Sequence, residues 1–216
     1  MNTLILDCSC GMSIYLICDD NIVSHIDNNQ KRHTDELLLS VDNLLKEANI
    51  SVKEINNICV CIGPGSFTGI RVAVSICKGL AIGTGAKIFV ANNFETASYK
   101  NTEKSIYILD GFSDYVYVRI DNLEKTFDSC EKINDVIEKI KSNYKDYKIY
   151  IQSEKVQNLL NNSEISAQFI KNHTVEVFKD KISENLYTNI NQISPIYLRA
   201  SQAEIEREEK LKRNLI

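Results

Sequence analysis

A glycine-rich block at residues 63–69, Gly-Pro-Gly-Ser-Phe-Thr-Gly, is the first feature of the sequence that could do chemistry. It separates an apolar run predicted as a strand from an apolar run predicted as a helix, and such a turn can hold an anion at the helix N-terminus. Its glycines follow neither the GxGxxG spacing nor the phosphate-loop spacing that ends in Gly-Lys-Ser/Thr. We favour the alternative in which the glycines only permit a tight turn and close packing of the helix on a sheet.

An aspartate at the end of the first predicted strand is the second such feature. Asp7 is followed by Cys8, Ser9, Cys10 and Gly11. A carboxylate at this junction could coordinate the metal of a bound nucleotide, or it could accept hydrogen bonds from the local turn, and the residues alone favour neither. Any vestigial nucleotide contacts are therefore expected from these two features, at Asp7, Ser9, Gly63, Gly65 and Ser66.

The cysteines form two alternating pairs, Cys8 with Cys10 and Cys59 with Cys61. Alternation places each pair on one face of a strand, which raises the hypothesis of a metal or redox site. The surrounding residues are apolar, and small buried cysteines are common in cores, so we favour the core interpretation. The three histidines form no HxxxH or HExxH pair. The sequence thus predicts no metal site, no cofactor and no catalytic residue.

The elements that must position these residues follow a regular order in the first half of the chain. Three short strands form a predicted antiparallel meander at residues 4–9, 12–18 and 21–27. They are followed by a helix at residues 34–49, a strand apolar on both faces at 57–62 and a second helix at 70–83. A strand at 87–90 and a short helix at 93–99 complete this part. The pattern predicts an α/β lobe over residues 1–100.

The second half begins after a polar stretch at residues 100–104 and predicts a smaller lobe over residues 101–216. A hairpin is predicted at residues 105–110 and 114–121, helices at 131–141, 153–160 and 182–190, and a strand at 148–151. An extended segment at 195–199 and a charged terminal helix at 203–213 follow. Six of the eight glycines lie between Gly63 and Gly85, and none follows Gly111. The second half therefore lacks glycine loops that could bring backbone close to a phosphate.

The composition restricts the class of protein. The chain has 216 residues, 44% of them hydrophobic and 25% charged, and a formal net charge of −4, which argues against a strongly basic nucleic-acid binder. Seven cysteines, an odd number at mostly apolar positions, argue against a disulfide framework. No run approaches the roughly 18 apolar residues of a membrane span, and the first residues lack a basic signal-peptide region, so we expect a cytoplasmic protein.

Four segments together resemble the TsaB (YeaZ) family. The glycine block with its continuation to residue 81 resembles the family's GPGSFTGLR…KGLA signature. Residues 4–9, 32–38 and 195–199 resemble its opening "LaiDTS", its "RxHSExLLP" and its C-terminal "PxYLR". The sequence departs from the family where Cys8 and Cys10 replace threonine, and where Phe112 and Tyr115 replace arginine and glutamate.

The resemblance implies an actin-like fold (sugar kinase/Hsp70/actin) of two ribonuclease-H-like lobes, the second reduced. It also implies a role in forming N6-threonylcarbamoyladenosine at tRNA position 37. In that pathway the TsaB protein is a non-catalytic partner of its paralogue TsaD, and the ATPase TsaE binds the pair. Direct contact with tRNA or a membrane is not expected.

The resemblance also implies a partner surface, because the family pairs with TsaD or with itself through the two helices of the first lobe. Here these are residues 34–49 and 70–83, whose apolar surface exceeds what one sheet can cover. The expected interface residues are Leu37, Leu38, Val41, Leu45, Ala73, Val74, Cys77, Leu80 and Ala81. Two alternatives stay open, an actin-fold enzyme (a kinase or a peptidase of the glycoprotease type) and a stand-alone homodimeric regulator.

Overall fold

The computed structural model describes residues 1–19, 21–27 and 33–199 and contains two mixed sheets. The first sheet has the strand order β3-β2-β1-β4-β5, formed by Asn21–Asp27, Met12–Cys18, Asn2–Asp7, Ile55–Cys61 and Lys87–Ala91. Its first three strands are antiparallel, and β4 and β5 continue in parallel with β1. The helices of this half are α1 (His33–Glu47), α2 (Phe67–Thr84) and the short α3 (Asn93–Ala97), with a 3-10 turn at Val52–Glu54.

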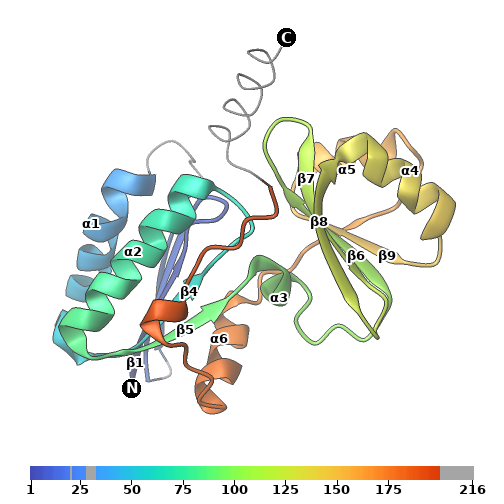
Figure 1. Ribbon diagram of the computed structural model, residues 1–216. Coiled ribbons are helices and arrows are strands. Elements are labelled where there is room, and N and C mark those ends of the chain that lie inside the picture. The colour runs from blue at the N-terminus through green and yellow to red at the C-terminus, as the bar shows by residue number, and fades with distance from the viewer. Residues whose placement is uncertain (20, 28–32, 200–216) are drawn as a thin grey trace, which may run out of the picture.

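The second sheet has the order β10-β9-β6-β7-β8. Its strands are Gln168–Phe169, Lys148–Ile151, Ser105–Asp110, Tyr115–Asp121 and Thr126–Lys132. Helices α4 (Ile133–Asn143) and α5 (Glu154–Asn161) connect them, α6 (Thr174–Ser183) follows the last strand, and a second 3-10 turn spans Ile190–Gln192. Figure 1 shows the two sheets side by side, the first with α1 and α2 and the second with α4 and α5.

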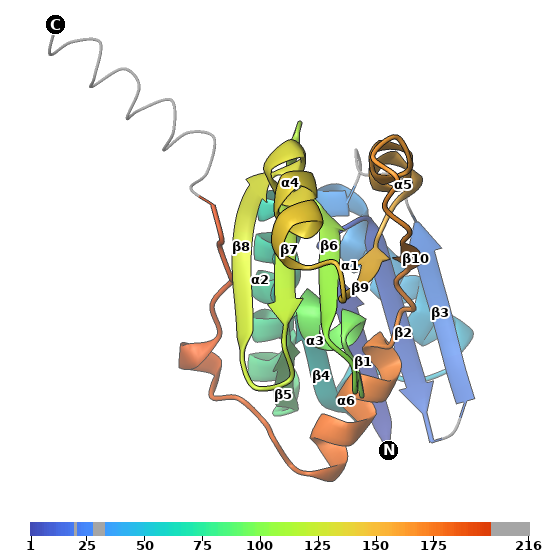
Figure 2. The same cartoon turned by 90° about the vertical axis from the view of Figure 1, so that its right-hand side faces the viewer.

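Strand alternation distributes the core over both faces of each sheet. On the outer face of the first sheet, residues such as Leu4, Leu6 and Val60 pack beneath α1 and α2. The opposite face, with Ile5 and Phe89, packs against α6. The second sheet places one face under α4 and α5 and turns the other toward α3 (Figure 2). The molecule is therefore layered in this order: α1 and α2, the first sheet, α6 with α3, the second sheet, and α4 with α5.

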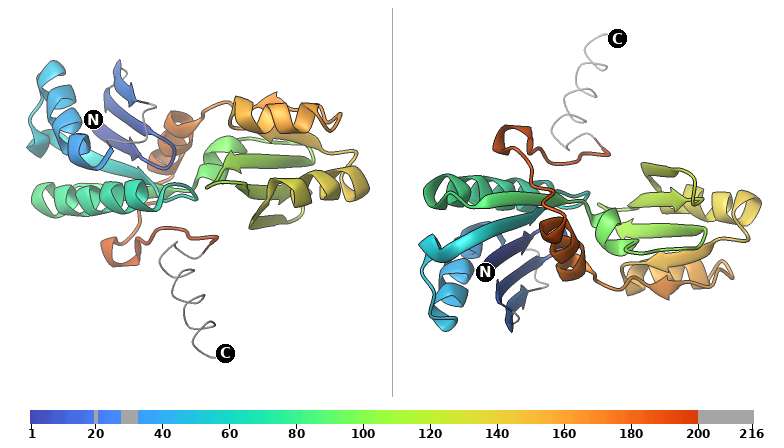
Figure 3. Two further views of the ribbon diagram at one scale, coloured as in Figure 1. Left: turned by 90° about the horizontal axis from the view of Figure 1, so that it is seen from above. Right: turned by 90° about the horizontal axis from the view of Figure 1, so that it is seen from below.

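The chain returns to the first sheet after completing the second. Phe178 of α6 is fully buried in the cluster formed with β4 and β5, and the Thr188 backbone N–H donates to the Ile88 carbonyl at 2.7 Å. Residues 184–199, the C-terminal segment of the described chain, then run along the first half toward the junction of the two sheets (Figure 3). The boundary near residue 100 stays a prediction, and residues 174–193 contribute to the core of the first sheet.

The structure confirms the order of the eight elements predicted for the first half and differs from the sequence analysis in three respects. The helix expected at residues 182–190 is wrong, because the helix in this region spans Thr174–Ser183. Strand β8 was not predicted, since its solvent-facing residues are largely polar. Helix α2 begins three residues earlier than expected because the Ser66 side chain caps it. The helix expected at 203–213 lies outside the described residues.

Helix α2 is long and apolar enough to cross a membrane by length and composition alone. In this fold one of its faces packs on the first sheet, through residues such as Ile70, Ala73 and Cys77. Core helices of proteins that never meet a membrane can have the same length and composition. Leu80 lies at the edge of this core and is only partly buried; the surface around it is considered below.

Candidate functional site

The turn between β1 and β2 is organised around the Asp7 carboxylate. The Ser9 backbone N–H and the Ser9 hydroxyl both donate to Asp7 Oδ1, at 2.9 and 2.6 Å. The buried Cys61 thiol of β4 is a further hydrogen-bond partner of Asp7. In an open loop these groups could donate hydrogen bonds to a phosphate, but here they already donate to a side chain of the same chain. The interpretation of Asp7 as a turn aspartate is the one that matches this geometry.

The glycine-rich turn packs directly on the backbone of the β1–β2 turn. A Cβ added at Gly65 would lie 2.4 Å from the Ser9 carbonyl oxygen, and one at Gly69 would lie 2.1 Å from the Cys8 carbonyl oxygen. The Ser66 N–H donates to the Ser9 carbonyl at 2.8 Å. The glycines thus allow helix α2 to approach the sheet more closely than any side chain would permit, as the favoured interpretation of the block requires.

The five vestigial nucleotide contacts expected from the sequence separate into two groups. Asp7 and Ser9 line a cavity of about 240 Å³ between the two sheets. Gly63, Gly65 and Ser66 are not among the described residues that line this cavity. The glycine turn and the cavity are therefore neighbours that share the β1–β2 turn but do not form one pocket.

Asn93, the first residue of α3, connects the two turns and was not anticipated from the sequence. Its Nδ2 donates to Ser9 Oγ at 2.5 Å and to the Pro64 carbonyl at 2.9 Å, and its backbone N–H donates to the Gly63 carbonyl at 2.9 Å. Its Oδ1 is buried and has no hydrogen-bond partner in the described part of the chain. The preceding Asn92, which caps α3, is a visible sequence signal, but nothing in the sequence marks Asn93 itself.

The buried cysteines are held as thiols. Burial, aided by the charge of Asp7, raises the pKa of Cys8 to about 12 and that of Cys61 well above its ordinary value. Burial also raises the pKa of Cys59 and of Cys77. A protonated thiol is neither a good nucleophile nor a metal ligand. Within the described ranges, no three side chains of His, Cys, Asp or Glu converge as a metal site would require.

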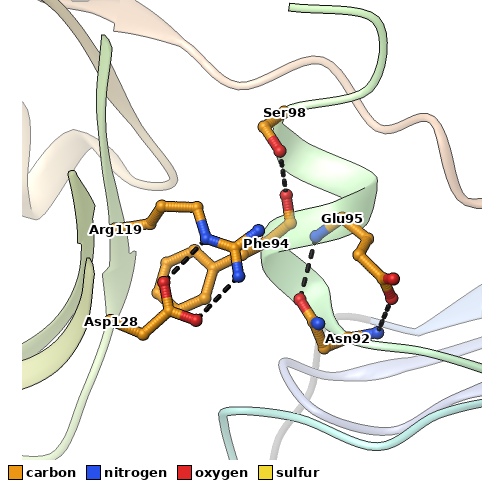
Figure 4. Close-up of polar contacts among 6 residues, drawn as sticks. All are labelled: Asn92, Phe94, Glu95, Ser98, Arg119 and Asp128. Carbon is orange, nitrogen blue, oxygen red and sulfur yellow. Dashed lines mark hydrogen bonds and ion pairs between the residues drawn. The ribbon is translucent and has the colours of Figure 1, made fainter. Parts of the chain in front are cut away.

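Helix α3 is also the point where the second sheet meets the first. Figure 4 shows Arg119 of β7 paired with Asp128 of β8 through two hydrogen bonds of 2.7 Å, with its guanidinium 4.8 Å from the centre of the Phe94 ring. Phe94 is buried among Tyr107, Leu109 and Tyr117 of the second sheet. The stacked cation and the bidentate pair together hold α3 against the second lobe.

Replacing Arg119 with methionine is expected to lower the free energy of unfolding by about 2 kcal/mol, because it removes the cation over Phe94 and leaves Asp128 unpaired. The Arg119 side chain is only 11% exposed, so solvent screens this pair little. Urea denaturation followed by circular dichroism measures the change. Lys148, whose pair with Glu103 is about half exposed, provides the control. Lys148→Met is expected to change stability by less than about 0.5 kcal/mol; equal losses in the two variants would contradict the role given to Arg119.

The extended segment at residues 195–199 lies across the glycine-rich turn and reaches both lobes (Figure 1). The Ile196 N–H donates to the Ile62 carbonyl at 2.8 Å, and the Tyr197 ring stacks on Phe67 with centroids 4.7 Å apart. Arg71 donates from Nε to the Tyr197 hydroxyl at 2.7 Å. Arg199 lies over the Tyr115 ring of the second sheet, at 4.3 Å from its centre. Two motifs more than a hundred positions apart in the sequence thus form one structural unit.

The expected interface residues occupy two different environments. Most are buried inside their own chain, namely Leu37, Val41, Leu45, Ala73, Val74, Cys77 and Ala81. Leu38 is 56% exposed, and Leu80 is partly buried at the edge of the core. Two further exposed apolar residues that were not in the expected set, Leu39 and Val52, lie beside Leu38 and Leu80. A shallow groove of about 580 Å³ lies between α1 and α2, with Leu38, Leu39 and Leu80 in its lining.

Comparison with protein families gives one match over most of the chain. The family model described as "TsaD: tRNA N6-adenosine threonylcarbamoyltransferase" matches residues 21–174. Curated relatives match over shorter stretches. The Escherichia coli (strain K12) protein "tRNA threonylcarbamoyladenosine biosynthesis protein TsaB" is 35% identical over 71 residues, 33% of this chain and 31% of the relative. Its Bacillus subtilis (strain 168) counterpart is 30% identical over 86 residues, 39% of this chain and 38% of the relative. The matched region therefore spans well under half the length of these relatives.

Solved structures match nearly the whole fold at low sequence identity. A Pseudomonas aeruginosa protein described as similar to peptidase YeaZ superposes with a TM-score of 0.72 and 18% identity, over 92% of this chain and 99% of that one. A structure titled "YeaZ from Pseudomonas aeruginosa" gives 0.69 and 17%, over 91% and 99%. The expected actin-like fold with a reduced second lobe is thereby confirmed.

Proposed function

The chain belongs to the TsaD protein family as a TsaB (YeaZ) member, and we propose that it serves threonylcarbamoyladenosine formation in tRNA as a subunit without catalytic activity of its own. The names of its relatives refer both to this biosynthesis and to the threonylcarbamoyltransferase. The proposed partners are a TsaD-like catalytic paralogue and a TsaE-like ATPase. Contact with tRNA is indirect, and the place of action is the cytoplasm.

The interior of the junction supports a role without nucleotide chemistry. The Ser9 donors are bonded to Asp7, and the glycine turn is filled by the backbone of Cys8 and Ser9. The cavity of about 240 Å³ is smaller than the roughly 300–1,000 Å³ of pockets that take drug-sized ligands. A nucleotide would have to displace the chain's own contacts to place its phosphates here.

We expect negligible ATP hydrolysis by the purified chain, with or without Mg²⁺, for the same reasons. Phosphate release measured over hours at about millimolar ATP is the appropriate assay. Clear metal-dependent turnover that copurifies with the monomer would favour the kinase alternative, and release of peptides from a protein substrate would favour the peptidase alternative.

One observation carries the proposal of a partner surface, the exposed apolar edge of α1 and α2. Leu38 and Leu39 are 56% and 59% exposed, and both line the groove between the two helices together with Val52 and Leu80. Large apolar side chains grouped on one surface, next to a groove, are typical of protein-binding sites. Gly79 and Gly83 of α2 have open space above their Cα atoms, so a second helix could approach α2 closely.

The proposed occupant of this surface is the TsaD-like paralogue, and a second copy of this chain is the alternative. Copurification of the two tagged proteins, followed by an in vitro tRNA modification assay with and without this chain, tests the proposal. Complex formation and loss of modification when the chain is omitted are the expected results. A stable homodimer that neither binds the paralogue nor affects modification would favour the stand-alone regulator.

A further inference from the structure

The cavity between the sheets has the features of a built site for a small polar molecule. It is lined by the β1–β2 turn, by α3 and by the residues that precede and begin α6, with further residues from β2, β3, β6 and the end of β9, so both halves of the chain form its walls. Its volume of about 240 Å³ corresponds to roughly eight water molecules at about 30 Å³ each. This volume matches a small metabolite and is below the roughly 300–1,000 Å³ of pockets that take drug-sized ligands.

The floor of the cavity offers hydrogen-bond acceptors. Asp7 receives the Ser9 N–H, the Ser9 hydroxyl and the Cys61 thiol. A carboxylate has about four acceptor positions, so one remains for a ligand. The negative charge of Asp7 opposes a phosphate or a carboxylate at this end and attracts a cation.

Asn93 adds a buried acceptor next to Asp7. The residue is only 8% exposed, and its Oδ1 has no partner within the described ranges. Its amide orientation is fixed, because the Pro64 carbonyl can only accept a hydrogen bond and therefore requires Nδ2 on that side. The Ser9 hydroxyl links Asn93 to Asp7, through bonds of 2.5 and 2.6 Å. A ligand that donates several N–H bonds would satisfy both acceptors, and an unsatisfied buried acceptor is costly.

The rim of the cavity has the opposite charge. Lys171 is exposed and lines the cavity, and no ion-pair partner is found for it among residues 1–19, 21–27 and 33–199. Part of the cavity wall is apolar and consists of Ala97, Leu109 and Ile170, which belong to one cluster. The cavity is thus lined by a carboxylate, an ammonium group and an apolar wall.

We propose that this cavity binds a free α-amino acid with a small side chain as its zwitterion. The α-ammonium donates to Asp7 and to Asn93 Oδ1, and the α-carboxylate pairs with Lys171. The side chain lies against the apolar wall. An α-amino acid carries both charges on groups bonded to the same carbon and is therefore the simplest small metabolite that matches both Asp7 and Lys171.

Titration of the full chain with L-serine, followed by isothermal calorimetry and by amide NMR shifts, tests the site. Saturable binding is expected, with shifts at the β1–β2 turn and at the start of α6. Ethanolamine, which is serine without its carboxylate, and glycerate, which has a hydroxyl in place of the ammonium, are each expected to bind at least about tenfold more weakly, since each loses one charged hydrogen-bond partner.

Lys171→Met is expected to weaken serine binding about tenfold. Lys179→Met, which changes another exposed lysine, on α6 and outside this cavity, is the control that leaves binding unchanged. Both changes are on the surface, so folding is preserved. Absence of saturable serine binding, equal binding of glycerate, an unaffected Lys171→Met variant, or shifts at this cavity caused by ATP and not by serine would each overturn the proposal.

Discussion

Replacing Gly69 with alanine is expected to lower the free energy of unfolding by about 3 kcal/mol, at the upper end of the usual cost of overpacking. The added Cβ would lie 2.1 Å from the Cys8 carbonyl oxygen and 3.3 Å from the Cys8 Cβ. Neither neighbour can move easily, because Cys8 directly follows β1, the central strand of the sheet, and α2 is fixed by its own buried face. Thermal and urea denaturation followed by circular dichroism measure the loss.

Gly79→Ala is the matched control, since Gly79 lies in the same helix and has no atom within 4 Å of an added Cβ. Alanine has the higher helix propensity, so this change is expected to raise stability by about 0.5–1 kcal/mol. Opposite signs for the two alanines would distinguish close packing from a general need for glycine flexibility. Two losses of similar size would contradict the packing interpretation of the glycine-rich turn.

The parts of the fold that were predictable from sequence are those set by local patterns. The meander of β1 to β3 alternates regularly and is separated by turn residues, so its bounds were close to those of the structure. The glycine-rich block gave the turn before α2, and Asp110 and Tyr115 bound the hairpin predicted around Gly111. In each case the residues that determine the element lie within it.

The parts that were missed depend on contacts between distant segments. Asn93 matters because Ser9 and Pro64 lie beside it, and neither neighbour is visible in its local sequence. Helix α6 has β-branched residues at alternating positions, and its buried Phe178 packs on strands far away in the chain. Tertiary packing overrides weak local propensity in such segments. The basic rim at Lys171 was likewise unpredictable, because it faces the cavity only once α6 has returned to the first sheet.

The expected partner residues illustrate a related limit of periodicity. An apolar stripe identifies the face of a helix that avoids water, and in α1 and α2 that face is chiefly the one turned toward the chain's own sheet. Val74 belongs to it, so a charge at this position would disrupt the core and could not report on an interface. The residues left for a partner are those outside the stripe, of which Leu38 and Leu39 are the most useful probes.

Leu38→Asp is expected to weaken binding of the TsaD-like paralogue by about 100-fold, while the isolated chain keeps its stability. Central apolar interface residues typically contribute about 2–4 kcal/mol, and a buried unpaired carboxylate adds to the loss. The monomer tolerates the change because the Leu38 side chain is 56% exposed. Surface plasmon resonance with the immobilised paralogue measures the affinity, and denaturation of the variant measures its stability.

Leu123→Asp is the control, because Leu123 is exposed to the same extent, 55%, but lies between β7 and β8 of the second lobe. It introduces the same charge and removes the same apolar area, so any general effect of charge on the association will appear in both variants. A selective loss with Leu38→Asp places the contact on α1. Equal affinities for the two variants would show that the partner binds elsewhere, and the exposed apolar edge of α1 and α2 would then need a different occupant, with a second copy of this chain as the first to test by sedimentation.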